Sequence, residues 1–342
     1  MSNAAEGESV ARGEGISRAS GGRIWWAHFE FTRMNIEPTI LCKKIEERRV
    51  VRAFASTCSV RSPKSEDRMM AAGQLNVSNH RIRLRWRPHW LGRDRLPLMD
   101  DWFDTLAAGH ELSSDAAGEL CERGFVVLPG ALPSGEMDRV RRAYDAVVAS
   151  AAADDVKVGS TTTRVNDFVN RGVEFDAVYV FPPLLEACCR IIGQPFKLSS
   201  LHARTLQPHL PVSELHVDVR RDSADWPLAG FILMIDEFRP DNGATRFVPG
   251  SHRWPGTPEE VLEDRRADHD DQLLACGPAG SMLVFNGSAW QGHTANTTGA
   301  PRRSVQGAFI PWDGRAGTNF SARLRPETRA RIGPLAKYVL AV

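Results

Sequence analysis

The sequence predicts an α+β protein with a mainly β core, in which an antiparallel double sheet follows a group of helices. Two observations lead to this prediction. Helical patterns come first, between residues 114 and 192, and short apolar runs with a period of two follow from residue 196. Pro, Gly and Asn turn signals such as Asp241-Asn242-Gly243 separate these runs, as is typical of antiparallel sheets.

The helices and the first strand are predicted from their boundary residues. We expect helices over residues 115–123, 134–153 and 175–192, and a buried strand over residues 125–128. Ser113 or Ser114 can cap the first helix, and Gly124 ends it. The third helix is expected around Pro182 and Pro183, because proline is acceptable at a helix start.

Further strands are predicted after the helices because apolar residues recur there in short runs bounded by turns. These strands cover residues 196–203, 215–219, 228–235, 245–248, 282–285 and 304–310. We interpret residues 154–163 as a polar loop. Residues 254–275 are acidic and rich in Arg, and we expect an excursion there with a short helix near residues 258–266.

Charge divides the chain into two parts. Residues 1–95 carry 18 Lys and Arg against 10 Asp and Glu, whereas residues 96–342 carry 25 against 32. We therefore expect a basic, poorly ordered N-terminal extension over 1–95 and a folded domain over 96–342. The alternating arginines of residues 81–87 would suit RNA or phosphate, but the total net charge of +1 argues against a dedicated nucleic-acid binder.

The cysteines and the hydrophobic runs exclude further classes of protein. The 6 cysteines show no C-x-x-C spacing, so we expect reduced thiols and no structural zinc site. No apolar run approaches the roughly 20 residues of a membrane helix, and the N-terminus lacks the order of a signal peptide. We expect a cytoplasmic protein without a membrane partner, and the sequence leaves its oligomeric state open.

His216 and Asp218 form the pattern around which the chain is organised. In an extended strand these two side chains share one face, while Leu215 and Val217 lie on the other. An imidazole beside a carboxylate supplies two of the three donors of a 2-His-1-carboxylate site, which holds Fe(II) and leaves coordination positions open. The same pattern also arises by chance as a surface ion pair, so it needs support from elsewhere in the chain.

Residues 290–304 offer that support. An iron site of this type needs a third ligand from a distant strand, and a cation nearby to bind a carboxylate co-substrate. His293 can supply the ligand. Arg302 and Ser304 fall on one face of a strand, where a guanidinium beside a hydroxyl suits a carboxylate, and Arg303 should point away.

Four segments occur in a characteristic order within residues 112–312. They are Gly124 to Gly130, Leu215 to Asp218, Asp241 to His252 and Gly280 to Arg303. Together they resemble the phytanoyl-CoA dioxygenase family of Fe(II)/2-oxoglutarate-dependent oxygenases. The resemblance implies a double-stranded β-helix, a jelly-roll or cupin-like fold, with N-terminal flanking helices. It also implies that His216 and Asp218 are catalytic iron ligands, and that Arg302 with Ser304 binds the distal carboxylate of 2-oxoglutarate.

The chain departs from the family pattern at the third ligand. The family's distal His stands eleven residues before the arginine, and in this chain that position is Gln291. His293 lies two residues further on, and a shift past Gly292 could bring it to the metal. Since imidazole is the better donor for Fe(II), we expect iron to be held by His216, Asp218 and His293. The alternative is that Gln291 marks a degraded iron site.

The resemblance implies hydroxylation of a small molecule, in which Fe(II), 2-oxoglutarate and O₂ are used and succinate and CO₂ are released, with ascorbate as a reductant. The alternative function is a jelly-roll that binds a carboxylate ligand without turnover. His252 lies in a family turn and is interpreted as a packed or capping residue. Substrate contacts are expected from residues 254–275 and from Arg164, Asn166, Asp167, Asn170, Arg220 and Arg221.

Overall fold

This computed structural model describes residues 99–159, 161–221 and 227–342. The predicted extension over residues 1–95 lies outside the described residues, so its boundary and its lack of order stay predictions. Among the described helices, none combines the length and apolar character needed to cross a membrane. In this part of the chain, the cysteines at 121, 188 and 276 are free thiols.

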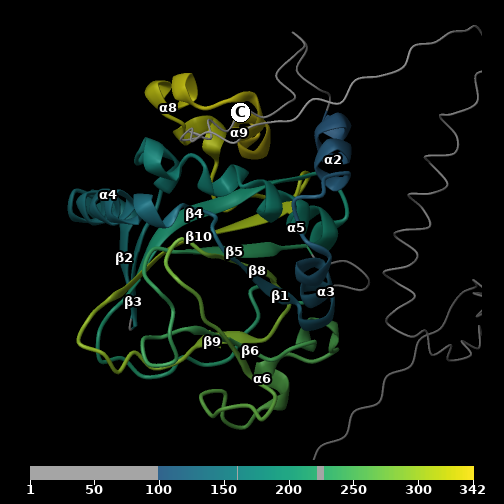
Figure 1. Cartoon of the computed structure of the whole chain (residues 1–342), viewed down its shortest axis with the longest axis vertical. Coiled ribbons are helices and arrows are strands. Elements are labelled where there is room, and N and C mark those ends of the chain that lie inside the picture. The colour runs from purple at the N-terminus through teal and green to yellow at the C-terminus, as the bar shows by residue number, and fades with distance from the viewer. Residues whose placement is uncertain (1–98, 160, 222–226) are drawn as a thin grey trace, which may run out of the picture. The chain divides into compact units, whose positions relative to one another are not determined.

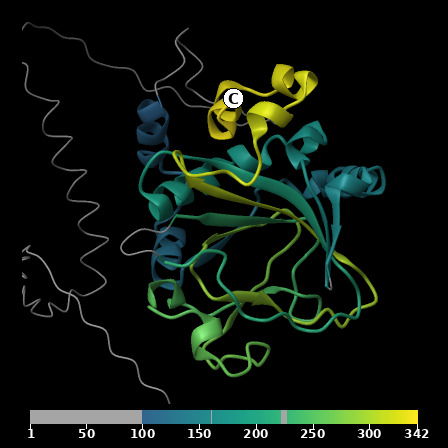
Figure 2. The same cartoon turned by 180° about the vertical axis from the view of Figure 1, so that it is seen from behind.

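Two antiparallel sheets form the β core and lie in separate layers in both views (Figures 1 and 2). The large sheet has the strand order β1-β8-β5-β10-β4-β3-β2, and the small sheet has the order β7-β6-β9. Their bounds are β1 (Phe125–Leu128), β2 (Val156–Val158), β3 (Thr162–Val165), β4 (Phe196–Leu206), β5 (Ala229–Met234), β6 (Thr245–Phe247), β7 (Leu273–Ala275), β8 (Met282–Asn286), β9 (Gln291–His293) and β10 (Arg302–Pro311). The predicted double sheet is confirmed.

Most of the helices precede or follow the main run of strands in the chain, and the short α6 lies between β6 and β7. The helices are α2 (Met99–Ala107), α3 (Ser114–Arg123), α4 (Met137–Ala149), α5 (Pro182–Ile192), α6 (Pro258–Val261), α7 (Phe320–Arg323), α8 (Pro326–Arg331) and α9 (Pro334–Leu340). The predicted boundaries of α3 are confirmed, because the Ser113 side chain accepts a hydrogen bond from the Ala116 N–H and Gly124 ends the helix at φ 83°.

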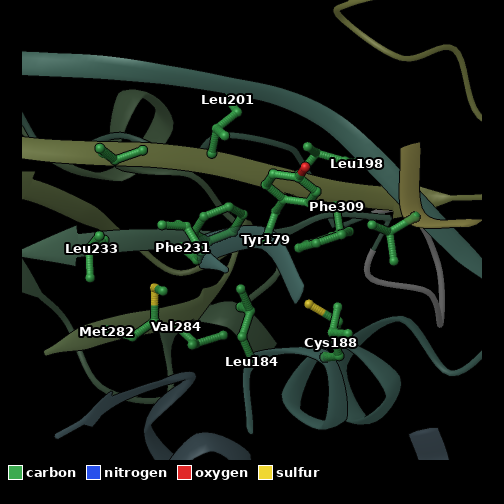
Figure 3. Close-up of a cluster of buried hydrophobic side chains, with 14 of the residues drawn as sticks. Tyr179, Leu184, Cys188, Leu198, Leu201, Phe231, Leu233, Met282, Val284 and Phe309 are labelled. Carbon is green, nitrogen blue, oxygen red and sulfur yellow. The ribbon is translucent and has the colours of Figure 1, made fainter. Parts of the chain in front are cut away.

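The large sheet has two separate cores, one on the face that the helices cover and one on the face that the small sheet covers. On the helix side, Leu184 and Cys188 of α5 belong to the same buried cluster as Phe231, Val284 and Phe309 of the strands (Figure 3). Between the sheets, the ring of Phe125 stacks on Phe247 with centroids 4.3 Å apart, and Phe285 completes the group at 5.5 Å from Phe247. These aromatic contacts hold the two sheets together at one end of the space between them.

Several predicted boundaries differ from the structure. Residues 215–219 were expected to form a strand. In the structure only His216 of this segment pairs with β9, in an isolated bridge. Part of the expected polar loop at 154–163 is the β2–β3 hairpin, whose strands pair Val156 with Val165 at the far edge of the large sheet. The predicted second helix begins with a 3-10 turn, and α4 proper ends at Ala149.

The turn glycines allow a stability prediction. Gly124 and Gly130 both have positive φ, 83° and 72°, but a Cβ at Gly124 would collide with the His252 imidazole, whereas a Cβ at Gly130 would meet nothing within 4 Å. We expect Gly130→Ala to lower the free energy of unfolding by about 1 to 2 kcal/mol. Gly124→Ala should cost about 1 to 3 kcal/mol more, because it adds a steric clash. Urea denaturation of both variants measures the difference, and equal losses would contradict the proposed packing of His252.

Candidate functional site

A cavity of about 280 Å³ lies between the two sheets. The small sheet and the segment that precedes it contribute Ser213, His216, Asp218, Thr245, Gln291 and His293. The large sheet contributes Arg164, His202, Arg204, Ile232, Phe285, Arg302 and Gln306. Residues that are far apart in the sequence, among them His216, Asp218, His293 and Arg302, therefore line one cavity.

His216 and Asp218 project into this cavity from the segment beside β9. His216 Nε2 lies 3.8 Å from Asp218 Oδ1, and both side chains are partly exposed. His216 Nδ1 lies 3.1 Å from the Glu214 carbonyl oxygen. Since a carbonyl can only accept, Nδ1 donates this hydrogen bond, and in the neutral imidazole Nε2 then has the lone pair that a metal-binding histidine needs. Leu215, on the opposite side, packs with Val248 and Trp290 behind the small sheet.

Gln291 lies directly opposite His216. The backbone N–H of each residue donates to the carbonyl oxygen of the other, at 2.9 Å in both directions. This register sets His293 beside Ser213. Asp218 lies on the opposite side of the His216–Gln291 bridge, where its N–H donates to the Gly287 carbonyl oxygen. Gln291 is therefore nearer along the strands to Asp218 than His293 is.

His293 is buried and holds an unpartnered nitrogen in the cavity. Its Nδ1–H donates to the Thr294 carbonyl oxygen at 2.8 Å, and its Nε2 has no hydrogen-bond partner. Burial lowers the pKa of His293 to about 4, and the positive charge of Arg302 adds to this decrease. The hydrogen bond to Thr294 acts in the opposite direction and raises the pKa. Arg302 thus lies close enough to His293 to act on it electrostatically.

No group of three His, Cys, Asp or Glu side chains in residues 99–159, 161–221 and 227–342 is arranged to hold a metal ion. His293 therefore does not form such a group with His216 and Asp218. The physical reason is the register of β9, because two residues along a strand span roughly 6 to 7 Å. Gln291 takes the position opposite His216 instead, where its side chain can offer a neutral amide oxygen.

Arg302 is a buried cation that pairs with no carboxylate in the described part of the chain. It is 3% exposed, its guanidinium carbon lies 4.0 Å above the centre of the Phe238 ring, and its Nε and Nη1 have no hydrogen-bond partner. Burial lowers the pKa of Arg302 to about 9, and the neighbouring Arg204 adds to this shift. A buried guanidinium with free N–H groups fits a carboxylate of 2-oxoglutarate, which would supply the missing acceptors.

The two neighbours of Arg302 on β10 behave differently. Arg303 points to the opposite face, as predicted, and donates to Asp236 at 2.8 and 2.9 Å and to Asp145 at 2.6 Å. Ser304 shares the face of Arg302 but is fully buried, and its hydroxyl donates to the Arg204 carbonyl oxygen at 3.0 Å. The Ser304 hydroxyl would have to give up this bond to reach a ligand.

Two cavity residues on β4 were not foreseen from the sequence. Burial lowers the pKa of His202 to about 3, with Arg164 and Arg204 adding to the shift. The Arg204 side chain lines the cavity and donates to Gln306 Oε1 at 3.2 Å. The alternation Ser200-x-His202-x-Arg204 places these polar residues on one strand face and could have indicated them.

Arg246 positions the wall that carries His216. This arginine is fully buried and donates to the carbonyl oxygens of Ser213, Arg265 and Ala267 at 2.8 to 2.9 Å. The middle of the 254–275 excursion is thereby fixed against the segment that leads to His216. The sequence motif around Gly243 contains this arginine, but its buried role was not predicted.

The expected substrate contacts are largely corrected by the structure. Among the six residues predicted for this role, only Arg164 lines the cavity. Asn170 donates to Asp167 and to the Arg323 carbonyl oxygen, so this pair anchors the C-terminal segment. Arg220 pairs with Glu260, and Arg221 donates to the Arg253 carbonyl oxygen. Asn166 accepts a hydrogen bond from Arg171 through its carbonyl oxygen.

A larger hollow, of about 630 Å³, lies beside α4 on the other face of the large sheet. Arg303, Asp145 and Asp236 line it, and these charges are paired with one another. The hollow therefore lacks the unpaired polar groups that distinguish the cavity between the sheets.

The family model for phytanoyl-CoA dioxygenase (PhyH) matches residues 120–304, more than half of the 342 residues of the chain. The chain belongs to this family. The match contains β1 to β9, His216, Asp218 and Arg302, so it covers the cavity just described. The protein is thus an Fe(II)/2-oxoglutarate-dependent dioxygenase by family, as the sequence predicted.

Similar proteins have been described in fungi. Dioxygenase af480 of Aspergillus fumigatus is 25% identical over 241 residues, which cover 67% of this chain and 76% of that protein. The iron/alpha-ketoglutarate-dependent dioxygenase okaE of Penicillium ochrochloron is 26% identical over 193 residues, covering 51% of this chain and 62% of okaE. Among solved structures, HygX of Streptomyces hygroscopicus with nickel and 2-oxoglutarate bound aligns with a TM-score of 0.49 and 16% identity, over 59% of this chain and 88% of HygX.

Proposed function

We propose that this PhyH-family protein hydroxylates a small organic molecule, using Fe(II) and O₂ and converting 2-oxoglutarate to succinate and CO₂. One observation carries the proposal. Arg302 is a buried guanidinium with two unpartnered nitrogens, and it lines the same cavity as the exposed pair His216 and Asp218. A site for an anionic co-substrate thus lies next to two donors suited to iron.

In this proposal His216 Nε2 and the Asp218 carboxylate bind the iron, and a β9 side chain is the third protein donor. His293 was the expected donor, but the pairing of Gln291 with His216 and the missing three-residue group support Gln291. When bound, the iron supplies the activation of O₂ for oxidation of a C–H bond. The chain orients the co-substrate through Arg302, while Ile232 and Phe285 provide an apolar wall of the cavity.

The test is the uncoupled reaction of the purified full-length protein. With Fe(II), ascorbate, air and 2-oxoglutarate, we expect succinate to form above the level of a metal-free control. The variant His216→Ala/Asp218→Ala should fall to that control level while it still binds 2-oxoglutarate through Arg302. A wild-type protein that forms no more succinate than this variant would refute turnover.

A second function, binding of a carboxylate ligand without turnover, is favoured by Gln291 and by the lack of a three-residue metal group in the described part of the chain. It gives a different result in the same experiment. The protein would then bind 2-oxoglutarate equally well with and without Fe(II), and no succinate would form.

A further inference from the structure

Two arginines besides Arg302 line the cavity and lie in one row across the large sheet. Arg164 of β3 is paired with Arg204 of β4, and Arg204 is paired with Ser304 of β10. Residues paired across antiparallel strands share a sheet face, so both arginines are on the face that carries Arg302. Both line the cavity.

These two cations have little to neutralise them. Arg204 Nε is buried without a hydrogen-bond partner, and the hydrogen bond from its Nη1 goes to the neutral amide of Gln306. The Arg164 guanidinium makes no hydrogen bond or ion pair with another residue in the described part of the chain. Burial and the charge of Arg164 both lower the pKa of Arg204, whereas Asp218 raises it. Two neighbouring guanidinium groups at a partly buried site repel each other, which an anion would relieve.

The charges of the proposed iron and 2-oxoglutarate do not remove this excess. Among the described residues that line the cavity, Asp218 is the only acidic one, against Arg164, Arg204 and Arg302. One carboxylate of 2-oxoglutarate neutralises Arg302 in the proposed function. The second carboxylate and Asp218 together match the two positive charges of Fe(II). No described residue that lines the cavity then remains as a counter-anion for Arg164 and Arg204.

We propose that the molecule to be hydroxylated carries an oxyanion, a carboxylate or a phosphate, which Arg164 and Arg204 bind. This inference rests on the proposed function and adds the chemical class of the substrate. The apolar part of the molecule lies against Leu228, Ile232 and Phe285, which line the same cavity. Guanidinium groups bind both kinds of oxyanion through paired hydrogen bonds.

The experiment uses the full-length protein under anaerobic conditions, loaded with Fe(II) and saturated with 2-oxoglutarate. The probes are phenylacetate and phenyl phosphate, each with its neutral counterpart, phenylacetamide or phenol, and calorimetry measures binding. We expect at least one anionic probe to bind about ten- to hundredfold more tightly than its neutral counterpart, the range of a charge-assisted hydrogen bond. The better of the two anions distinguishes a carboxylate substrate from a phosphate one.

Matched variants show which residues cause the preference for the anionic probe. Arg164→Gln and Arg204→Gln should each reduce the preference for the anionic probe about tenfold, whereas the exposed Arg239→Gln on the other face of the sheet should leave it unchanged. All three variants should bind 2-oxoglutarate like the wild type.

Three results can be told apart. If the wild type binds 2-oxoglutarate but does not distinguish anionic from neutral probes, the inference on the substrate is wrong. It is also wrong if Arg204→Gln weakens 2-oxoglutarate binding and leaves the probes unaffected, because Arg204 would then serve the co-substrate. If the wild type does not bind 2-oxoglutarate at all, the proposed function itself fails.

Discussion

Arg302→Met is expected to weaken 2-oxoglutarate binding on the order of ten- to hundredfold, since a hydrogen bond to a charged group contributes about 1.5 to 3 kcal/mol. The same change should raise the thermal stability of the ligand-free protein. The guanidinium is 3% exposed and lacks partners for two nitrogens, and replacing buried charge with an apolar side chain of similar volume often stabilises a protein by about 1 to 4 kcal/mol. Calorimetric titration and thermal denaturation measure the two effects.

Arg303→Met is the matched control for this prediction. Arg303 is next in the chain but points to the other face, where it pairs with Asp236 and Asp145. Its loss leaves Asp236 without its principal partner, so stability should fall while 2-oxoglutarate affinity stays near that of the wild type. Equal losses of affinity in the two variants would contradict the assignment of Arg302 to the co-substrate.

Gln291→His is expected to raise the affinity for Fe(II) at least about tenfold. Changes around a metal site typically alter metal affinity by roughly ten- to hundredfold. Imidazole is a stronger donor to Fe(II) than a neutral amide oxygen, and residue 291 is paired directly with His216. His293→Ala should leave Fe(II) affinity close to that of the wild type, because the register of β9 sets this residue away from Asp218. Anaerobic titration with Fe(II) checks both variants without relying on turnover.

The opposite pattern would support the expectation drawn from the sequence. If Fe(II) binding is lost in His293→Ala and is unchanged in Gln291→His, then His293 completes the iron site after a local rearrangement of β9. Gln291→Ala serves as the control for both outcomes, since it removes the amide without adding an imidazole.

Elements with strong local signals were predictable from the sequence. The helix from Ser114 to Arg123 has a serine cap and a glycine stop, and the following apolar run Phe125–Leu128 is a strand at the predicted residues. The β2–β3 hairpin was missed because its strands lie at a sheet edge and carry polar residues such as Lys157 and Arg164. Polar edge strands resemble loops when only local composition is considered.

The candidate site was predictable where residues lie close in sequence, and less so where contacts cross between sheets. Strand periodicity predicted that His216 and Asp218 share a face and that Arg302 faces away from Arg303. These residues line the cavities accordingly, although residues 215–219 pair at His216 alone. The register that places Gln291 opposite His216 depends on pairing with a distant segment. The burial of Arg204 and Arg246 depends on what packs above them, which local patterns do not encode.

Arg246 attaches the 254–275 excursion through contacts that do not depend on the side chains of the excursion. Its three shortest hydrogen bonds go to main-chain carbonyl oxygens of Ser213, Arg265 and Ala267, and every residue type offers such an oxygen. The side chains of the 254–275 excursion can therefore change over evolution, or in a designed library, while the excursion keeps its attachment to the segment that carries His216. Sequence variation introduced there would explore new surface chemistry at little cost to the architecture beneath it.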